Sequence, residues 1–106
     1  MGNKVSIQFK NNEDKSVILF SHWMGMSLVK IAKTYLKDLN KWLKKRNSNI
    51  IDPIQRKEPN TVMIDFIRFL TDFLQLTRIE GDLYLSVDEN DGDNSNNGHH
   101  IIDLNK

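Results

Sequence analysis

The apolar residues of this chain recur with a period of two near both ends and at helical spacing in the middle. Val5, Ile7 and Phe9 alternate with polar residues near the N-terminus, and Leu83 and Leu85 begin a similar alternation near the C-terminus. Alternation is typical of a half-buried strand, because successive strand side chains point to opposite faces. Spacing of three to four residues is typical of an amphipathic helix. The sequence therefore predicts an α+β fold with helices between strands.

The N-terminal part of the chain contains the first predicted hairpin. Its first strand is "KVSIQFK" (residues 4–10), and "NNED" (residues 11–14) forms the turn, because Asn and Asp side chains bond the nearby backbone. "SVILF" (residues 16–20) is a continuous apolar run of strand length. This second strand is predicted to be buried on both faces.

Two helices are predicted in the centre of the chain. The first spans residues 27–46, with Ser27 as its N-cap. Its apolar stripe consists of Leu28, Ile31, Tyr35, Leu39, Trp42 and Leu43. The second helix spans residues 59–76, and Asn60 or Thr61 can cap it.

The C-terminal part is predicted to form a second hairpin. Residues 82–88 are its first strand, residues 89–98 a flexible polar loop, and residues 99–105 its second strand. The element order is ββααββ. We expect the two hairpins to form a mainly antiparallel four-stranded sheet with both helices on one face, within a single domain that spans residues 1–106.

Composition excludes several classes of protein. The chain has no cysteine, so it has neither disulfides nor thiol chemistry. No apolar run approaches the roughly 20 residues of a membrane span. The N-terminal residues lack the apolar core of a signal peptide. We therefore expect a cytoplasmic protein.

Charge is distributed unevenly along the chain. Residues 1–57 hold 12 Lys and Arg against 4 Asp and Glu, a balance of +8, whereas residues 58–106 hold 3 against 10, a balance of −7. Such asymmetry indicates either a basic face for a partner or two halves that attract each other. The basic residues of the first helix are Lys30, Lys33, Lys37, Lys41, Lys44, Lys45 and Arg46. Their side can bind nucleic acid or a protein partner, and a solvated helix face is the competing interpretation.

A second notable segment is "SHWMG", where a strand gives way to a helix. Ser21 and His22 are adjacent, so on a strand their side chains diverge and do not form a nucleophile–base pair. We expect a structural corner in which Trp23 covers the end of the core, near Ile31 or Tyr35. Gly25 supplies the permissive backbone for the turn.

Metal and cofactor sites are not predicted. His22, His99 and His100 are the only histidines, and the last two diverge because they are consecutive. The acidic loop fits the first half of a calcium loop that begins at Asp93, but Leu104 stands at the twelfth position, where a carboxylate is needed.

Several matching residues carry a resemblance. They are Phe20-Ser21-His22-Trp23, Gly25, Gly81, the acidic loop from Asp88 to Asp93, and the ending "IIDLN". In this order they resemble a group of small uncharacterised proteins of prophages, viruses and archaea, which carry a "YSHWGG"-like segment. The chain departs from that pattern at Met24, and "DLYLSV" replaces a "YGI"-like strand. The resemblance implies a mobile-element origin and an α+β fold, and it implies no enzymatic activity.

The sequence favours a small, non-catalytic interaction protein that modulates a host protein or complex. Its contacts would come from the acidic loop and C-terminal hairpin, or from Ile64 and Phe69, which fall outside the apolar stripe of the second helix. A nucleic-acid accessory protein that uses the lysine face is the first alternative. A hydrolase-like enzyme centred on His22 is the second.

Overall fold

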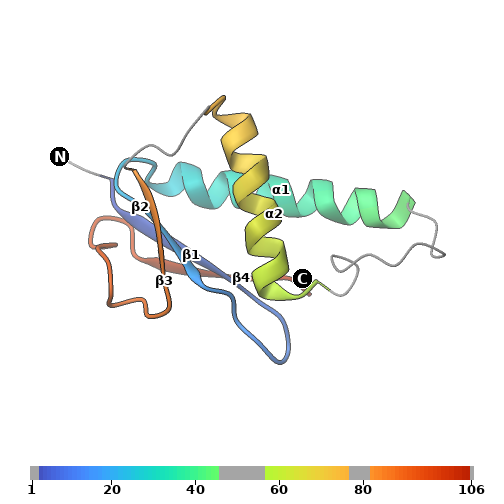
Figure 1. The fold of residues 1–106 in the computed structure, drawn as a ribbon, viewed down its shortest axis with the longest axis horizontal. Helices are drawn as coiled ribbons and strands as arrows, with labels where there is room; N and C mark the ends of the chain where they lie inside the picture. Colours follow the sequence, from blue (N-terminus) through green and yellow to red (C-terminus); the bar gives the residue numbers. More distant parts are fainter. Residues whose placement is uncertain (1–2, 46–56, 77–81, 106) are drawn as a thin grey trace.

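The computed structural model describes residues 3–45, 57–76 and 82–105. A four-stranded sheet is covered on one face by two crossing helices (Figure 1). The elements are β1 (Val5–Lys10), β2 (Ile18–Ser21), α1 (Met26–Lys45), α2 (Pro59–Phe73), β3 (Leu83–Ser86) and β4 (His99–Asp103). Among the described residues, no helix is long and apolar enough to cross a membrane.

The sheet is mixed, with the strand order β3-β2-β1-β4. β1 pairs antiparallel with β2, β2 antiparallel with β3, and β1 parallel with β4. The prediction of a mainly antiparallel sheet built from two hairpins is therefore wrong, because β3 and β4 lie at opposite edges. Residues 87–98 cross the sheet between them, and a connection of about a dozen residues suffices to join parallel strands. Strand alternation alone does not reveal which strands pair.

The main core lies between the helices and the sheet. Val5, Ile7 and Phe9 point toward the helices and are fully buried. The ring of Phe66 from α2 packs edge-on against Phe9, with ring centroids 5.6 Å apart. Tyr35 from α1 lies 5.4 Å from the same Phe66 ring. One aromatic cluster thus joins α1, α2 and β1.

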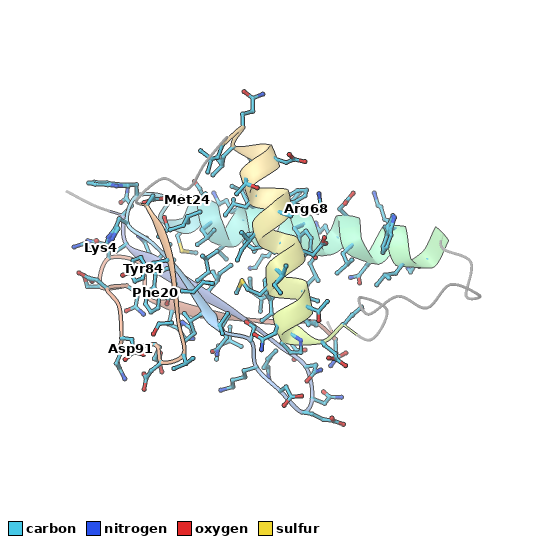
Figure 2. The ribbon with its side chains drawn as sticks, viewed as in Figure 1. Lys4, Phe20, Met24, Arg68, Tyr84 and Asp91 are labelled. Atoms are coloured by element: carbon cyan, nitrogen blue, oxygen red, sulfur yellow. The ribbon has the colours of Figure 1, made fainter. Side chains whose placement is uncertain are left out.

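The opposite face of the sheet is covered as well. Phe20 and Tyr84, both labelled in Figure 2, stack there, and their ring centroids are 4.9 Å apart. Residues 87–98 run over this stack, and a Cβ built on Gly92 would lie only 2.7 Å from the Phe20 ring. The prediction that β2 is buried on both faces is confirmed, since all four of its residues are buried. The segment is not the loop of a β-hairpin, as predicted, because β3 and β4 do not pair; it lies over the second face of the sheet.

The helices differ from prediction at their ends. α1 begins at Met26, and Ser27 is exposed inside its first turn instead of capping it. α2 begins at Pro59 with Glu58 as N-cap and ends at Phe73, before the predicted end. Asn60 does not cap α2, because its Oδ1 accepts a hydrogen bond from the Val17 N–H at 2.8 Å.

The turn between β1 and β2 follows the predicted chemistry. The Oδ1 of Asn11 accepts hydrogen bonds from the N–H groups of Glu13 at 2.8 Å and Asp14 at 2.7 Å. A side chain that bonds its own backbone in this way reverses the chain within a few residues. The turn carries Lys10 and Lys15 on its two sides, joined by an isolated antiparallel bridge.

Candidate functional site

The "SHWMG" corner is organised by a carboxylate from a distant segment. Asp82, just before β3, accepts hydrogen bonds from the Ser21 hydroxyl and from the backbone N–H groups of His22 and Trp23, all at 2.9 Å. The Ser21 hydroxyl oxygen also accepts a bond from the Met24 N–H at 3.1 Å. Ser21 therefore pairs with Asp82, and its hydroxyl has no bond to the His22 ring in the described structure.

Trp23 does not fill the core as predicted. Its side chain is 62% exposed, whereas Met24 packs against the core cluster. The physical reason is the backbone path, which turns around the Asp82 carboxylate and directs Met24 inward in place of Trp23. Gly25 adopts a φ of 56°, and a Cβ there would lie 3.0 Å from the Cβ of Asn3. The corner depends on Asp82 and Gly25.

His22 is half-buried beside the sheet. Its ring centroid lies 5.2 Å from that of Tyr84, and its backbone N–H bonds Asp82. A hydrolytic site needs a nucleophile within hydrogen-bond reach of the base, and Ser21 is engaged elsewhere. The geometry around His22 gives no support to the hydrolase alternative.

The lysine face of α1 is exposed as the sequence suggests. Its described side chains are Lys30, Lys33, Lys37, Lys41 and Lys44. Lys45 is the last residue of α1, and the structure describes its backbone only. Arg46 lies outside the described residues. With a helical rise of about 1.5 Å per residue, the cations from Lys30 to Lys44 extend over about 21 Å. The basic N-terminal half of the chain also contacts the acidic C-terminal half, since Lys4 and Asp93 form an ion pair at 3.0 Å.

A groove of about 660 Å³ brings part of this face together with the sheet. Lys33 and Lys37 of α1 line one side, and Lys10 and Lys15 of the β1–β2 turn line the other. Leu36, Asn40, Ile101, Ile102 and Asp103 complete the lining. We call this the basic groove. The sequence pattern identified the helical lysines but missed Lys10 and Lys15, because only the folded turn brings them near α1.

Asp103 is the acidic residue of the basic groove, and it lies 3.7 Å from the Lys10 ammonium. Four lysines against one carboxylate leave the lining with an excess of positive charge. Ile101, on the sheet face opposite the helices, is 45% exposed. Exposed lysines beside an exposed apolar side chain suit a ligand that carries both negative charge and apolar groups.

The acidic loop lies on the face of the sheet opposite the helices. Asp93 sits beside Tyr84, whose hydroxyl accepts a hydrogen bond from the Asp93 N–H at 3.0 Å. The bond from the Ser95 backbone, and then the contact with Lys4, lowers the pKa of Asp93 to about 2. Ser86 bonds Asp91, which Figure 2 labels on the same segment. These acidic groups are held by the fold on the face opposite α1, and the neighbouring Asp88 and Glu89 line a second pocket together with Lys15 and Ile101.

A partly buried polar network, which the sequence did not reveal, joins β1 to β4. The Nδ1 of His99 lies 2.7 Å from the Ser6 hydroxyl, and its Nε2 lies 3.1 Å from the Oε1 of Gln8. Asn94 of the crossing segment donates to the same Ser6 hydroxyl at 2.9 Å. Ser6 is fully buried, so substrate cannot reach it as a nucleophile. The network fixes the crossing segment on the sheet, and only the parallel pairing of β1 with β4 creates it.

The His99 network predicts a pH dependence of stability. Burial lowers the pKa of His99 against an opposing attraction from Glu89, and His100 and Lys15 lower it further. As pH falls, His99 therefore binds a proton in the unfolded chain before it does so in the folded chain. The free energy of unfolding should fall as pH drops from about 6.5 through the lowered pKa. Chemical denaturation across this pH range measures the effect. His99→Gln should flatten this part of the profile, and an unchanged slope in that variant would assign the effect to other groups.

Metal binding has no support from the geometry. Among residues 3–45, 57–76 and 82–105, no three His, Asp or Glu side chains gather closely enough to hold an ion. His99 and His100 bond different partners, since the Nε2 of His100 lies 2.7 Å from the carbonyl oxygen of Asn97.

Comparison of the chain with protein-family models, with curated proteins and with solved structures gave no match. The likeness to small prophage, viral and archaeal proteins therefore stays a prediction from a few residues. The geometry of the basic groove is the basis for a functional proposal.

Proposed function

We propose that this protein acts by binding, without catalysis, and that its basic groove receives an acidic segment of a protein partner. One observation carries this proposal: four lysines, from α1 and from the β1–β2 turn, and the exposed Ile101 line one groove. A mixed acidic and apolar peptide would match both parts of the lining.

The other contact sites that the sequence suggested are weaker candidates than the basic groove. Ile64 is 71% exposed on α2, in line with its position outside the apolar stripe. Phe69, which shares that property in the sequence, packs its ring 5.4 Å from Tyr35 and so belongs to the fold. The acidic loop is held by Lys4 and Tyr84. The basic groove is thus the better candidate for the interaction site.

Nucleic-acid binding is the second candidate, favoured by the exposure of the lysines along all of α1. A phosphate backbone would use Lys41 and Lys44, beyond the groove, as well as Lys33 and Lys37. Its affinity would fall steeply with salt concentration, because bound counterions are released. The two candidates therefore predict different effects of lysine substitutions along the helix.

A matched pair of double variants separates these candidates. Lys33→Gln with Lys37→Gln should weaken binding of a fluorescein-labelled peptide of alternating glutamate and valine about tenfold, the equivalent of ~1.4 kcal/mol. Lys41→Gln with Lys44→Gln removes the same charge outside the groove and should change peptide affinity less than twofold. Fluorescence anisotropy at fixed ionic strength measures both.

The same variants are titrated with an oligothymidylate. Oligonucleotide binding that both double variants weaken equally, with no peptide binding by the parent protein, would replace the first candidate with the second. Failure of the parent to bind either probe would remove the basic groove from consideration as a binding site.

A further inference from the structure

The outer edge of β4 is unpaired by any described strand, because β4 ends the strand order. The ladder with β1 determines which backbone groups face outward. The Gly98 carbonyl accepts from the Ser6 N–H, and the Leu104 N–H donates to the Lys10 carbonyl, so both groups face β1. Since backbone direction alternates along a strand, the N–H and C=O groups of His99, Ile101 and Asp103 face away from β1.

The basic groove follows this free edge. Its lining includes the consecutive residues Ile101, Ile102 and Asp103, although successive strand side chains point to opposite faces. Ile101 and Asp103 are in register with Gln8 and Lys10 on one face, and Ile102 is in register with Phe9 on the other. Residues of both faces can line one groove only where it wraps the edge of the sheet.

We infer that an extended acidic segment of a partner protein binds in the basic groove by adding to β4 as a fifth strand. This inference rests on the proposed function and specifies its geometry. The outward N–H and C=O groups of Ile101 and Asp103 pair with the backbone of the segment. Its side chains alternate, so one set lies beside Lys33 and Lys37 and the other beside Ile101 and Lys15.

Charge complementarity selects this occupant over a second copy of the chain. Two copies paired through β4 would bring their groove lysines together, and lysines along an edge strand are a common protection against such pairing. An acidic strand meets the same lysines with attraction. The lysines therefore allow an acidic partner to add at this edge and disfavour self-association.

The experiment uses the ¹⁵N-labelled chain of residues 1–106 and the alternating glutamate–valine peptide. Saturation with peptide should slow amide hydrogen exchange at Ile101 and Asp103 at least tenfold, because their N–H groups become paired. Ile102, whose N–H faces β1, should change little and serves as the internal reference. A peptide of the same sequence with every backbone nitrogen methylated keeps its charges but cannot donate, and it should bind at least tenfold more weakly.

The outcomes distinguish the inference from the proposed function. If the methylated peptide binds as well as the parent peptide, or if exchange at Ile101 and Asp103 is unchanged at saturation, strand addition is wrong while the basic groove remains a binding site. If neither peptide binds, the proposed function fails first. Preferential binding of oligothymidylate without added protection at β4 would also overturn strand addition.

Discussion

Replacing Phe66 with alanine should lower the free energy of unfolding by about 3–5 kcal/mol, whereas Trp23→Ala should change it by about 0.5 kcal/mol or less. Phe66 is fully buried, and its ring contacts Phe9 and Tyr35 at centroid distances of 5.6 and 5.4 Å. Truncation leaves a cavity between α2, α1 and β1. Trp23, at 62% exposure, loses little contact when it is truncated.

Urea denaturation of both variants beside the parent protein measures this contrast. Domains are stable by only about 5–15 kcal/mol, so Phe66→Ala should melt far below the parent. A Trp23→Ala variant that lost as much stability as Phe66→Ala would mean that Trp23 lies in the core, as the sequence pattern suggested.

Asp82→Ala should lower the free energy of unfolding by about 3 kcal/mol. The carboxylate accepts three hydrogen bonds, from the Ser21 hydroxyl and from the N–H groups of His22 and Trp23. Its removal leaves Ser21, which is fully buried, without this partner. Asp82→Asn keeps one carbonyl acceptor and should cost less, about 1–2 kcal/mol.

Asp72→Ala is the matched control for Asp82→Ala. The Asp72 side chain is 85% exposed and lies 3.9 Å from Arg68, so its loss should change stability by about 0.5 kcal/mol or less. Thermal melts of the three variants at one pH give the comparison. Equal melting temperatures for Asp82→Ala and Asp72→Ala would show that the carboxylate does not hold the corner.

The elements themselves were predictable because each is encoded by local periodicity. The alternation of Val5, Ile7 and Phe9 placed β1, and the apolar stripe with Tyr35 and Leu39 placed α1. Asn11 predicted its turn through its own backbone bonds. Helix ends were less accurate: α1 begins at Met26, where the Gly25 carbonyl accepts a bond from the Leu28 N–H, and Ser27 lies inside the first turn.

The candidate site was predictable only in part. Exposed lysines on α1 follow from the helical period, because their side opposes the apolar stripe. The second wall of the basic groove, Lys10 and Lys15, depends on where the β1–β2 turn lies relative to α1. Asp82 was missed for the same reason, since its bonds join the segment before β3 to Ser21 at the end of β2.

The sequence by itself determined the two kinds of element, the double burial of β2 and the charged side of α1, because these depend on residues that are close along the chain. The tertiary structure decided the strand order, the parallel pairing of β4 with β1, and the exposure of Trp23. These depend on contacts between distant segments, whose free energy is absent from any local pattern. The free, lysine-lined edge of β4 is a product of that pairing, and a hairpin between β3 and β4 would have changed the edge that the basic groove follows.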